Sequence, residues 1–472
     1  MKQRAIVIGG GLGGMAAALT LSPYYEVHLF EKNDWLGGKM QAIQLGAHHF
    51  DYGPNTLTMP RYFWETIAPF CDAQKELPFK KLQNPTHHKW AQYELTFTTN
   101  REKMQQQLAV IDEKSAQNYP AFLAEVTRLF QISEQAFLTK TFFSAKDYVS
   151  PTLAYRLLQA HPWKTLDAFL KSFFPHPAVR QLFGRFATYI GSSPYASPAT
   201  FALIAYFELV DGTYYLRGGA TMIAHVFEKL LKRQHVHLHL QESIEKIAID
   251  DQRIVFCETT KQRYGADIVI SDVDYAKMQQ LLGRDEVTYE LSTSAYVELI
   301  ALKEPVSLHY HNVQFSSDYP AEFQALRLGT LPNEATVYSC YPFAADQQKK
   351  PALFVLINAP ATTTIDLTLA KNQVERALKI WGIEETQIIG RHVIPPDYVA
   401  QTFNVAQGAI YGQASNTLRG SFLRPANRDR QLKNLYFVGG TVHPGGGSPI
   451  VVKGGYEVAN RIILENSNCI KN

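Results

Sequence analysis

The sequence contains few cysteines, and none of them has the spacing of a metal-binding motif. Four cysteines, at positions 71, 257, 340 and 469, are scattered through 472 residues, and no Cys-x-x-Cys pair occurs. A disulfide framework and a zinc site are therefore not expected, and this usage is typical of a reducing cytosol. Cys257 and Cys340 lie in apolar strand-like runs, where we expect inert core side chains.

Three further absences narrow the class of protein. The net charge is only +3 and the pI is about 8.4, which is too mild and too evenly spread for a nucleic-acid partner. No apolar run reaches the roughly 18 residues of a membrane-spanning helix. The first strand-like stretch begins at residue 4, which leaves no room for a signal or transit peptide. We therefore expect a cytoplasmic protein that is not inserted across a membrane.

What the sequence does contain is a large apolar fraction arranged in helix and strand patterns. With 46% hydrophobic residues, a chain of 472 residues can bury the cores of two or three domains. The opening segment predicts a βαβ unit, with strands over 4–8 and 26–31 and a helix over 13–21. Residues 121–210 have mainly helical periodicity, whereas residues 295–358 contain strand-like runs typical of a largely antiparallel sheet. No polar linker separates these regions, so we predict interleaved domains.

The glycines near the start of the chain predict a dinucleotide-binding turn. Gly9, Gly11 and Gly14 match the pattern Gly-x-Gly-x-x-Gly between the first strand and the first helix. The first glycine allows the tight turn, the second allows a pyrophosphate to approach the backbone, and the third allows the helix to pack against the strand. The helix then directs its N-terminal N–H groups at the phosphates. Glu31, at the end of the second strand, can accept hydrogen bonds from ribose hydroxyls.

Two further glycine-rich segments favour FAD over NAD as this dinucleotide. A glycine pair follows Glu31 within Leu36–Met40, where the chain can wrap the far end of a longer cofactor. Near the other terminus, three glycines at 445–447 lead to Ser448 and Pro449, which suit the N-cap and first position of a helix. The N-terminus of that helix would stabilise the negative charge of a reduced flavin by roughly 0.3–1 kcal/mol. Both ends of the chain thus predict FAD.

Six segments, spread over nearly the whole chain, carry a more specific likeness. They are IVIGGGLGGMAAAL, EKNDWLGGKM, FDYGPNTLTMP, YIGSSPYASPATFALIAYFE, YYLRGG and RPANRDRQLKNLYFVGGTVHPGGGSPIVV. In these segments and their order the chain resembles the bacterial phytoene desaturase family of carotenoid-modifying flavoenzymes. The last segment is much more specific than the glycine turn, which many flavoproteins share.

The resemblance implies an α/β fold in which a Rossmann-type FAD-binding domain is interleaved with an α+β substrate domain that carries a helical, membrane-facing region. The FAD-binding domain would comprise residues 1–75, 215–290 and 400–472. The sheet-based substrate domain would comprise residues 76–117 and 291–399, and the helical region, facing substrate and membrane, residues 118–214.

The resemblance also implies which residues contact the cofactor. One of them, after the strand HVHLHL, has no sharp motif to anchor it and would face the adenine; the others stand in the glycine-rich segments at the two ends of the chain. The set is Gly9, Gly11, Leu12, Gly13, Gly14, Glu31, Lys32, Gly38, Lys39, Met40, Gly53, Pro54, Asn55, Thr56, Ile244 (after HVHLHL), Gly439, Gly440, Ile450 and Val451.

Histidines are the remaining candidates for chemistry. The resemblance places His443 near the flavin, where it could accept a proton; the alternative is a histidine that fixes the loop by bonding to backbone. His235, His237 and His239 alternate on a strand-like run and so share one face. No carboxylate or cysteine motif supports metal binding there, so we predict no metal site.

The implied substrate is a lipophilic polyene, which constrains the site. Each CH2 taken from lipid is worth about 0.8 kcal/mol, so the site must be an apolar tunnel that opens at a membrane surface. Within Leu153–Phe186, aromatic and basic side chains are mixed and could lie against anionic lipid; the alternative is a helix pair with an aromatic core face. These side chains are Trp163, Phe169, Phe173, Phe174, Phe183, Phe186, Lys164, Lys171, Arg180 and Arg185. We expect peripheral attachment to the inner face of the cell membrane, with other enzymes of the carotenoid pathway as partners.

The leading hypothesis is FAD-dependent desaturation of a phytoene- or diapophytoene-type polyene. A hydride would leave one carbon for the flavin and a proton its neighbour, so cofactor and substrate carry most of the chemistry. The nearest rival is oxidation of a terminal methyl group of a diapocarotenoid, which HPGGG, in place of the HPGAG of many desaturases, and GPNTLTMP both favour. Wider alternatives are an amine-oxidase-type flavoenzyme and a non-catalytic, flavin-holding carotenoid carrier.

Overall fold

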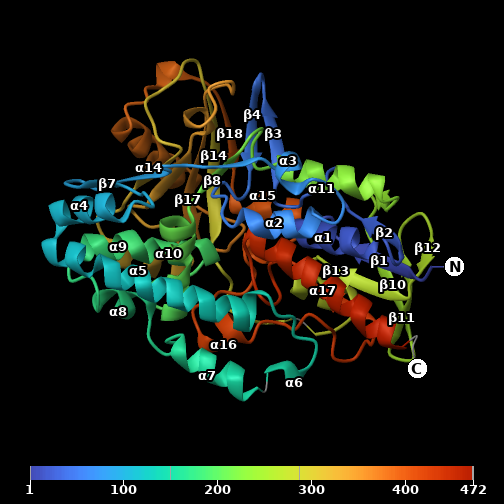
Figure 1. Cartoon of the computed structure of the whole chain (residues 1–472). Coiled ribbons are helices and arrows are strands. Elements are labelled where there is room, and N and C mark those ends of the chain that lie inside the picture. The colour runs from blue at the N-terminus through green and yellow to red at the C-terminus, as the bar shows by residue number, and fades with distance from the viewer. Residues whose placement is uncertain (1, 149, 286, 470–472) are drawn as a thin grey trace.

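A five-stranded parallel sheet collects strands from both ends and the middle of the chain. The computed structural model describes residues 2–148, 150–285 and 287–469 (Figure 1). The strand order is β19 (Leu435–Phe437), β13 (Ile268–Ser271), β1 (Arg4–Ile8), β2 (Glu26–Phe30) and β9 (His237–His239). The predicted βαβ unit and the Rossmann-type arrangement are confirmed. Since β2 ends at Phe30, Glu31 lies just beyond the strand rather than at its last position.

Successive residues of β1 face opposite sides of this sheet, and each side has its own core. Ala5 and Val7 pack with helices, whereas Ile6 and Ile8 pack beneath a small antiparallel sheet that includes the buried Cys257. The helices are α1 (Leu12–Leu21), α11 (Met222–Arg233) and α17 (Ser448–Cys469). The small sheet is β10 (Lys246–Asp250), β11 (Arg253–Glu258) and β12 (Arg263–Gly265). The prediction that Cys257 is a core residue is confirmed, as it is for Cys340.

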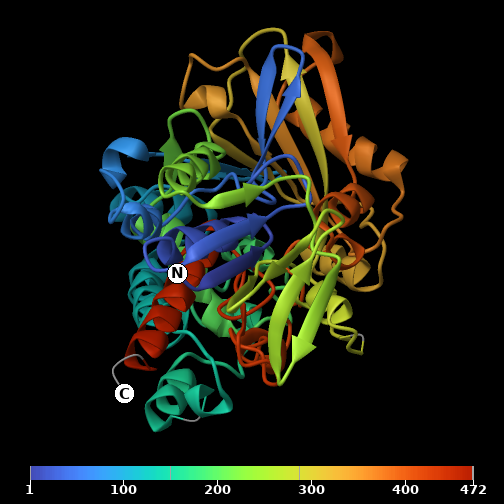
Figure 2. The ribbon, with the colours of Figure 1, turned by 90° about the vertical axis from the view of Figure 1, so that its right-hand side faces the viewer.

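A second sheet of seven strands is antiparallel except where β15 pairs with β6. Its order is β18 (Ile388–Ile394), β14 (Ser294–Leu302), β17 (Ala352–Ala359), β16 (Val337–Cys340), β15 (His311–Gln314), β6 (Thr86–Lys89) and β7 (Glu94–Thr96). The largely antiparallel sheet predicted over 295–358 is confirmed. Figure 2 shows this sheet in the upper part of the molecule, above the blue strands β1 and β2.

Both faces of the seven-stranded sheet are covered. Helix α14 (Leu367–Ile380) packs on one face. The hairpin of β3 (Gln41–Leu45) and β4 (His48–Tyr52), which the sequence analysis did not predict, packs on the other, with Phe50 and Tyr52 in the core. The hairpin therefore connects the segment that follows Glu31 to the second sheet.

Helices and short turns occupy most of residues 121–210, as the periodicity predicts, and they also occupy residues 101–120, which the prediction did not include. They are α4 (Arg101–Ile111), α5 (Glu113–Ser133), α6 (Ala145–Tyr148), α7 (Pro151–Gln159), α8 (Leu166–Lys171), α9 (Pro177–Gly184), the 3-10 turns Arg185–Ile190 and Ala199–Leu203, and α10 (Ile204–Tyr206). Elsewhere lie α2 (Pro60–Ile67), α3 (Ala73–Glu76), α12 (Tyr275–Leu281), α13 (Tyr319–Arg327), α15 (Pro396–Phe403), α16 (Leu418–Phe422) and the pair β5 (Phe79–Lys81) and β8 (Tyr214–Leu216).

Of the six aromatic side chains expected to face lipid, four are buried, Phe173 is half-buried and Trp163 is exposed. Four phenylalanines of α8, α9 and their connections are buried in the helical core, which is the alternative arrangement: Phe169, Phe174, Phe183 and Phe186. Arg185 is also buried, at 4% exposure, so its assignment to a basic surface is wrong. By contrast, α7 buries no side chain, and Tyr155, Leu158 and Trp163 are 62%, 55% and 68% exposed.

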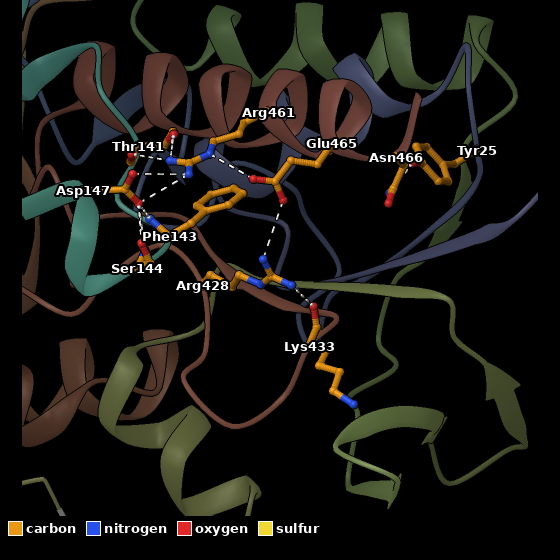
Figure 3. A network of polar contacts seen from close by, with 10 residues as sticks. All are labelled: Tyr25, Thr141, Phe143, Ser144, Asp147, Arg428, Lys433, Arg461, Glu465 and Asn466. Carbon is orange, nitrogen blue, oxygen red and sulfur yellow. Dashed lines mark hydrogen bonds and ion pairs between the residues drawn. The ribbon is translucent and has the colours of Figure 1, made fainter. Parts of the chain in front are cut away.

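Arg461 on α17 contacts the segment that leads into α6 (Figure 3). Its guanidinium donates to the Thr141 carbonyl at 2.8 Å, pairs with Asp147 at 3.3 Å and lies 4.1 Å from the centre of the Phe143 ring. Within the described ranges, no helix combines the length and the apolar character that crossing a bilayer requires.

Candidate functional site

The carboxyl ends of β1 and β13 form a crevice, because the chain leaves these neighbouring strands toward opposite sides of the sheet. Gly9 follows β1 and Asp272 follows β13. A β-carbon at Gly9 would lie 3.2 Å from the Asp272 carbonyl carbon, and the φ of Gly9 is +99°, which a larger residue adopts only with strain. The turn is thus built around glycine, as predicted.

The glycines that follow allow other segments to pack closely at the N-terminus of α1. β-carbons at Gly11 and Gly13 would fill the space beside Asp272 and Gly439; the one at Gly13 would lie 3.0 Å from the Gly439 nitrogen. Leu12 begins α1, and its side chain belongs to the core. Backbone N–H groups at a glycine-rich helix start fit the pyrophosphate of a dinucleotide.

Asp272 is a residue of this crevice that the sequence analysis missed. Its carboxylate accepts a hydrogen bond from the Gly14 N–H at 2.9 Å. Burial, reinforced by the neighbouring Glu31 carboxylate, raises the pKa of Asp272 to about 7, against the opposing effects of Gly14 and Lys39. The available signal was an acidic residue directly after a buried strand, in DIVISDVD.

Glu31 and the segment after it close the crevice from the other side. The Glu31 carboxylate accepts from the N–H groups of Gly10, at 2.8 Å, and Asn33, at 2.9 Å, and keeps lone pairs for further donors. Gly38 lies beside Gly11, where its β-carbon would be 3.2 Å from the Gly11 α-carbon. This places the second glycine segment against the first, as the FAD prediction requires.

Lys39 connects this segment to the next part of the site. Its ammonium donates to the Ile410 carbonyl, and desolvation lowers its pKa to about 8. The Lys39 backbone also meets Gly53, because a β-carbon at Gly53 would lie 3.1 Å from the Lys39 carbonyl carbon. Gly53, Pro54, Asn55 and Thr56 then line a cavity of about 280 Å³.

The carboxyl-terminal glycine loop forms the facing wall of this cavity. Gly445–Gly447 line it together with Ser448, Pro449 and Ile450, the first turn of α17, so the positive end of that helix is directed toward it. A β-carbon at Gly446 would lie 2.5 Å from the Tyr411 ring. Glycine backbone that faces a helix start across this cavity fits the ring system of a flavin.

The rest of the cavity wall is mainly apolar and comes from the helical core and the seven-stranded sheet. Among the described residues that line it, none is aspartate, glutamate or histidine. Two arginines are present, Arg185 and Arg424. Arg424 donates to the Gln413 carbonyl at 2.9 Å, and burial lowers its pKa to about 10. Apolar lining residues include Leu138, Phe201, Leu203, Ile204, Phe207 and Val313.

Several predicted contacts lie around the crevice and the cavity without lining them. Lys32 donates to the Gln401 carbonyl at 2.9 Å on the surface, and Ile244 is buried beside Phe30. The Gly440 carbonyl faces Arg424 at 3.5 Å. The two remaining side chains, Met40 and Val451, pack in the core that α1, α11 and α17 form on one side of the five-stranded sheet.

His443 has the arrangement of a loop-fixing histidine. Its Nε2 lies 3.1 Å from the Phe137 carbonyl and 3.0 Å from the Lys140 carbonyl, and its ring stacks on Phe142 at 4.1 Å. Burial lowers its pKa to about 4. His443 is not among the residues that line the cavity.

The alternating histidines are arranged differently from the prediction. Only His237 and His239 belong to β9, since His235 precedes the strand with a φ of +57°. A carboxylate is also present: ligand atoms of Glu26, His28 and His237 lie within 4.8 Å of one another. The sequence analysis missed this group because Glu26 and His28 come from β2, far along the chain.

Comparisons with known proteins agree with this geometry. The family described as flavin containing amine oxidoreductase matches residues 12–463. A 1-hydroxycarotenoid 3,4-desaturase from Flavobacterium sp. is 32% identical, with 95% of this chain and 96% of that protein covered. A zeta-carotene-forming phytoene desaturase from Myxococcus xanthus is 28% identical, over 98% and 94%.

A 4,4'-diaponeurosporene oxygenase from Staphylococcus aureus is 27% identical, with 98% of each chain covered. Among solved structures, an oxidoreductase from Methanosarcina mazei matches with a TM-score of 0.66 at 15% identity, over 98% of this chain and 100% of that chain. This last likeness concerns the fold alone.

Proposed function

Because the chain belongs to the family of flavin-containing amine oxidoreductases, we propose that it is an FAD-dependent enzyme that desaturates an acyclic carotenoid. The relatives named above are carotenoid desaturases and an oxygenase of a diapocarotenoid, and they match over almost their full length. We favour desaturation over oxidation of a terminal methyl group because the relatives at 32% and 28% identity are both desaturases.

The observation that carries the proposal is the composition of the cavity. The cavity is lined by residues of the two predicted flavin segments and by a wall made mainly of aromatic and aliphatic side chains. An alkylammonium substrate would meet two guanidinium groups there, and no carboxylate among the described lining residues. This disfavours an amine as substrate, whereas a hydrocarbon chain loses little on entering such a wall from lipid.

The chemistry requires little of the protein. When bound, FAD supplies the acceptor for a hydride from one substrate carbon. The adjacent carbon then loses a proton, and the two electrons of that C–H bond form the new double bond. Loss of hydride leaves an allylic cation that is strongly acidic, so a neutral oxygen of water or of a lining amide such as Asn358 suffices as proton acceptor. The chain positions the polyene and directs the start of α17 at the site of developing negative charge.

Anaerobic mixing of the flavin-loaded protein with a liposome-dispersed acyclic polyene tests the proposal. We expect flavin absorbance to bleach while a product with a longer chromophore forms in equal amount. A flavin that no polyene bleaches would refute desaturation. In a separate aerobic reaction under isotope-labelled O2, formation of a terminal aldehyde that contains the label would favour the methyl oxidase instead.

We also propose that the protein binds the surface of a membrane through α7 and α16. Tyr155, Leu158 and Trp163 are exposed, and so are Leu418 of α16, at 39%, and Leu423 directly after it, at 59%. Ser421 of the same helix lines the cavity, so exposed apolar side chains flank one side of the substrate site. Both helices lie at the bottom of Figure 1. Exposed aromatic and aliphatic side chains near basic ones such as Lys146, Lys164 and Arg419 suit an anionic lipid surface.

Flotation with anionic liposomes tests this surface. The double variant Trp163→Ser with Leu423→Ser should lose most of the liposome-bound fraction. Val110→Ser is the matched control, because Val110 is 80% exposed on α4, away from these helices. Equal flotation of both variants would refute the proposed surface. We place the attachment at the inner face of the cell membrane, beside enzymes that supply or consume the polyene, which fractionation of cells should show.

A further inference from the structure

One part of the cavity wall is polar, and its hydrogen-bonding capacity is not used by the protein. Arg185, at the start of the 3-10 turn Arg185–Ile190, and Tyr319, at the start of α13, both line the cavity and are both 4% exposed. The Arg185 Nε and Nη2 atoms and the Tyr319 hydroxyl have no hydrogen-bond partner. A buried donor without a partner is unfavourable in the folded protein, so such a cluster points to a ligand that completes it.

The charge of Arg185 is already balanced. Its Nη1 donates to the Tyr189 hydroxyl at 3.1 Å, and its Nη2 lies 3.6 Å from the buried Glu208 carboxylate. Tyr189 in turn donates to Glu208, and Thr86 donates to the other Glu208 oxygen at 3.2 Å. Burial opposes the charge on Arg185, but Tyr189 and Glu208 outweigh it and raise its pKa. The guanidinium is therefore permanently charged, paired, and short of acceptors for two of its nitrogens.

The neighbouring titratable groups add no compensating charge. His88 and His311 are buried beside Arg185, and burial together with the guanidinium keeps both neutral; the pKa of His311 falls to about 3. Burial raises the pKa of Glu322, near Tyr319, to about 7. With Arg185 and Glu208 cancelling, a carboxylate ligand would bring an unpaired charge into this wall. A neutral oxygen would not.

We infer that the cluster of Arg185 and Tyr319 binds a neutral oxygen group, a hydroxyl or a carbonyl, at one end of the polyene. The inference rests on the proposed function and specifies its substrate: an acyclic polyene with an oxygen-bearing end rather than a pure hydrocarbon. Arg185 supplies N–H donors, and the Tyr319 hydroxyl can donate to a carbonyl or exchange hydrogen bonds with a hydroxyl. Binding one end also fixes which carbons of the polyene lie against the flavin.

A site built to bond a polar group discriminates strongly against an analogue without it, because its own polar groups are then left unpaired. Hydrogen bonds to a charged group contribute about 1.5–3 kcal/mol, so an oxygen-bearing polyene should bind roughly 10- to 100-fold more tightly than the matching hydrocarbon.

The experiment compares three polyenes of equal length and unsaturation, ending in a methyl, a hydroxyl or an aldehyde group. Their binding to the flavin-loaded protein in liposomes is measured by quenching of flavin fluorescence, and turnover is measured separately. Tyr319→Phe removes only a hydroxyl that has no partner in the fold, and it should reduce the preference for oxygen-bearing polyenes by about tenfold. Tyr195→Phe is the control, since Tyr195 packs beside Tyr319 but does not line the cavity.

A second variant guards against a purely structural effect. Arg185→Gln combined with Glu208→Gln removes both charges together and should abolish the preference for oxygen-bearing polyenes. Arg185→Lys, which keeps a charge and N–H donors at this position, should retain part of that preference. Equal binding of the three polyenes to the unaltered protein, or a preference that Tyr319→Phe leaves unchanged, would overturn the inference. If the preference is present and lost in the variants but no polyene is desaturated, the inference stands and the proposed function fails. If all three polyenes are desaturated and bind equally tightly, the proposed function stands and this inference fails.

Discussion

Gly455 determines how closely α17 approaches α1, and replacing it tests whether the two helix starts form one cofactor site. The backbones of the helices meet at Gly13 and Gly455. A β-carbon at Gly455 would lie 3.0 Å from the Gly13 carbonyl carbon, nearer still to its oxygen, and 3.2 Å from the Ala16 β-carbon. Because the obstacle is backbone rather than the end of a flexible side chain, it cannot rotate away.

The expected cost of Gly455→Ala follows from these contacts. Carbon atoms pack at about 3.5–4.0 Å, so the helices must separate by at least about 0.5 Å. Overpacking of this kind costs roughly 1–3 kcal/mol of unfolding free energy, from which about 1 kcal/mol of gained helix propensity is subtracted. The net loss is about 0–2 kcal/mol, and FAD, which must contact both helix starts, should bind about tenfold more weakly.

Gly454→Ala provides a matched control one position away on the same helix. There the nearest atom would be Pro444 Cδ at 3.5 Å, an ordinary contact, so this variant should keep its FAD affinity and unfold at the same or a slightly higher temperature. The measurements are FAD titration followed by flavin fluorescence, and thermal unfolding with and without FAD. If Gly455→Ala binds FAD as tightly as Gly454→Ala and unfolds no earlier, the close-approach argument is wrong.

Three further predictions concern titratable groups. Since the pKa of Asp272 in the folded protein is raised to about 7, its neutral form stabilises the crevice at low pH, and this contribution is lost as the pH rises through 7. The affinity for FAD should therefore fall over the same pH range. Asp272→Asn should remove that pH dependence when FAD titrations are repeated at a series of pH values. Burial opposes ionisation of Asp147, but the N–H groups of its own loop and Arg461 outweigh it and lower the pKa. Its contribution is therefore complete above the ordinary value of 3.8 and lost as pH falls below it, and Asp147→Asn should flatten this acid limb in thermal unfolding. Burial raises the thiol pKa of Cys257 and Cys340 to about 12, so a maleimide should modify them only after unfolding, as peptide mass mapping can check.

Local patterns determined the part of the fold that holds the cofactor. The spacing of Gly9, Gly11 and Gly14 between an apolar run and a helical one specifies a strand, a turn and a helix start, because each glycine meets a constraint set by its immediate neighbours. Ser448 and Pro449 specify a second helix start in the same way. Neighbouring residues suffice for such inferences, and α1 and α17 begin within one residue of the predicted positions.

Tertiary structure alone decided which side of a segment is inside. The sequence suggests that Arg185 is a surface charge among aromatic residues, yet it is buried because Glu208, from a later turn of the chain, compensates its charge. Asp272 reads as the polar end of a strand, and it becomes part of the cofactor crevice only because β13 pairs with β1. An amphipathic pattern specifies that one face must be covered but not by what, since burial and charge pairing are properties of contacts between segments that are distant in sequence.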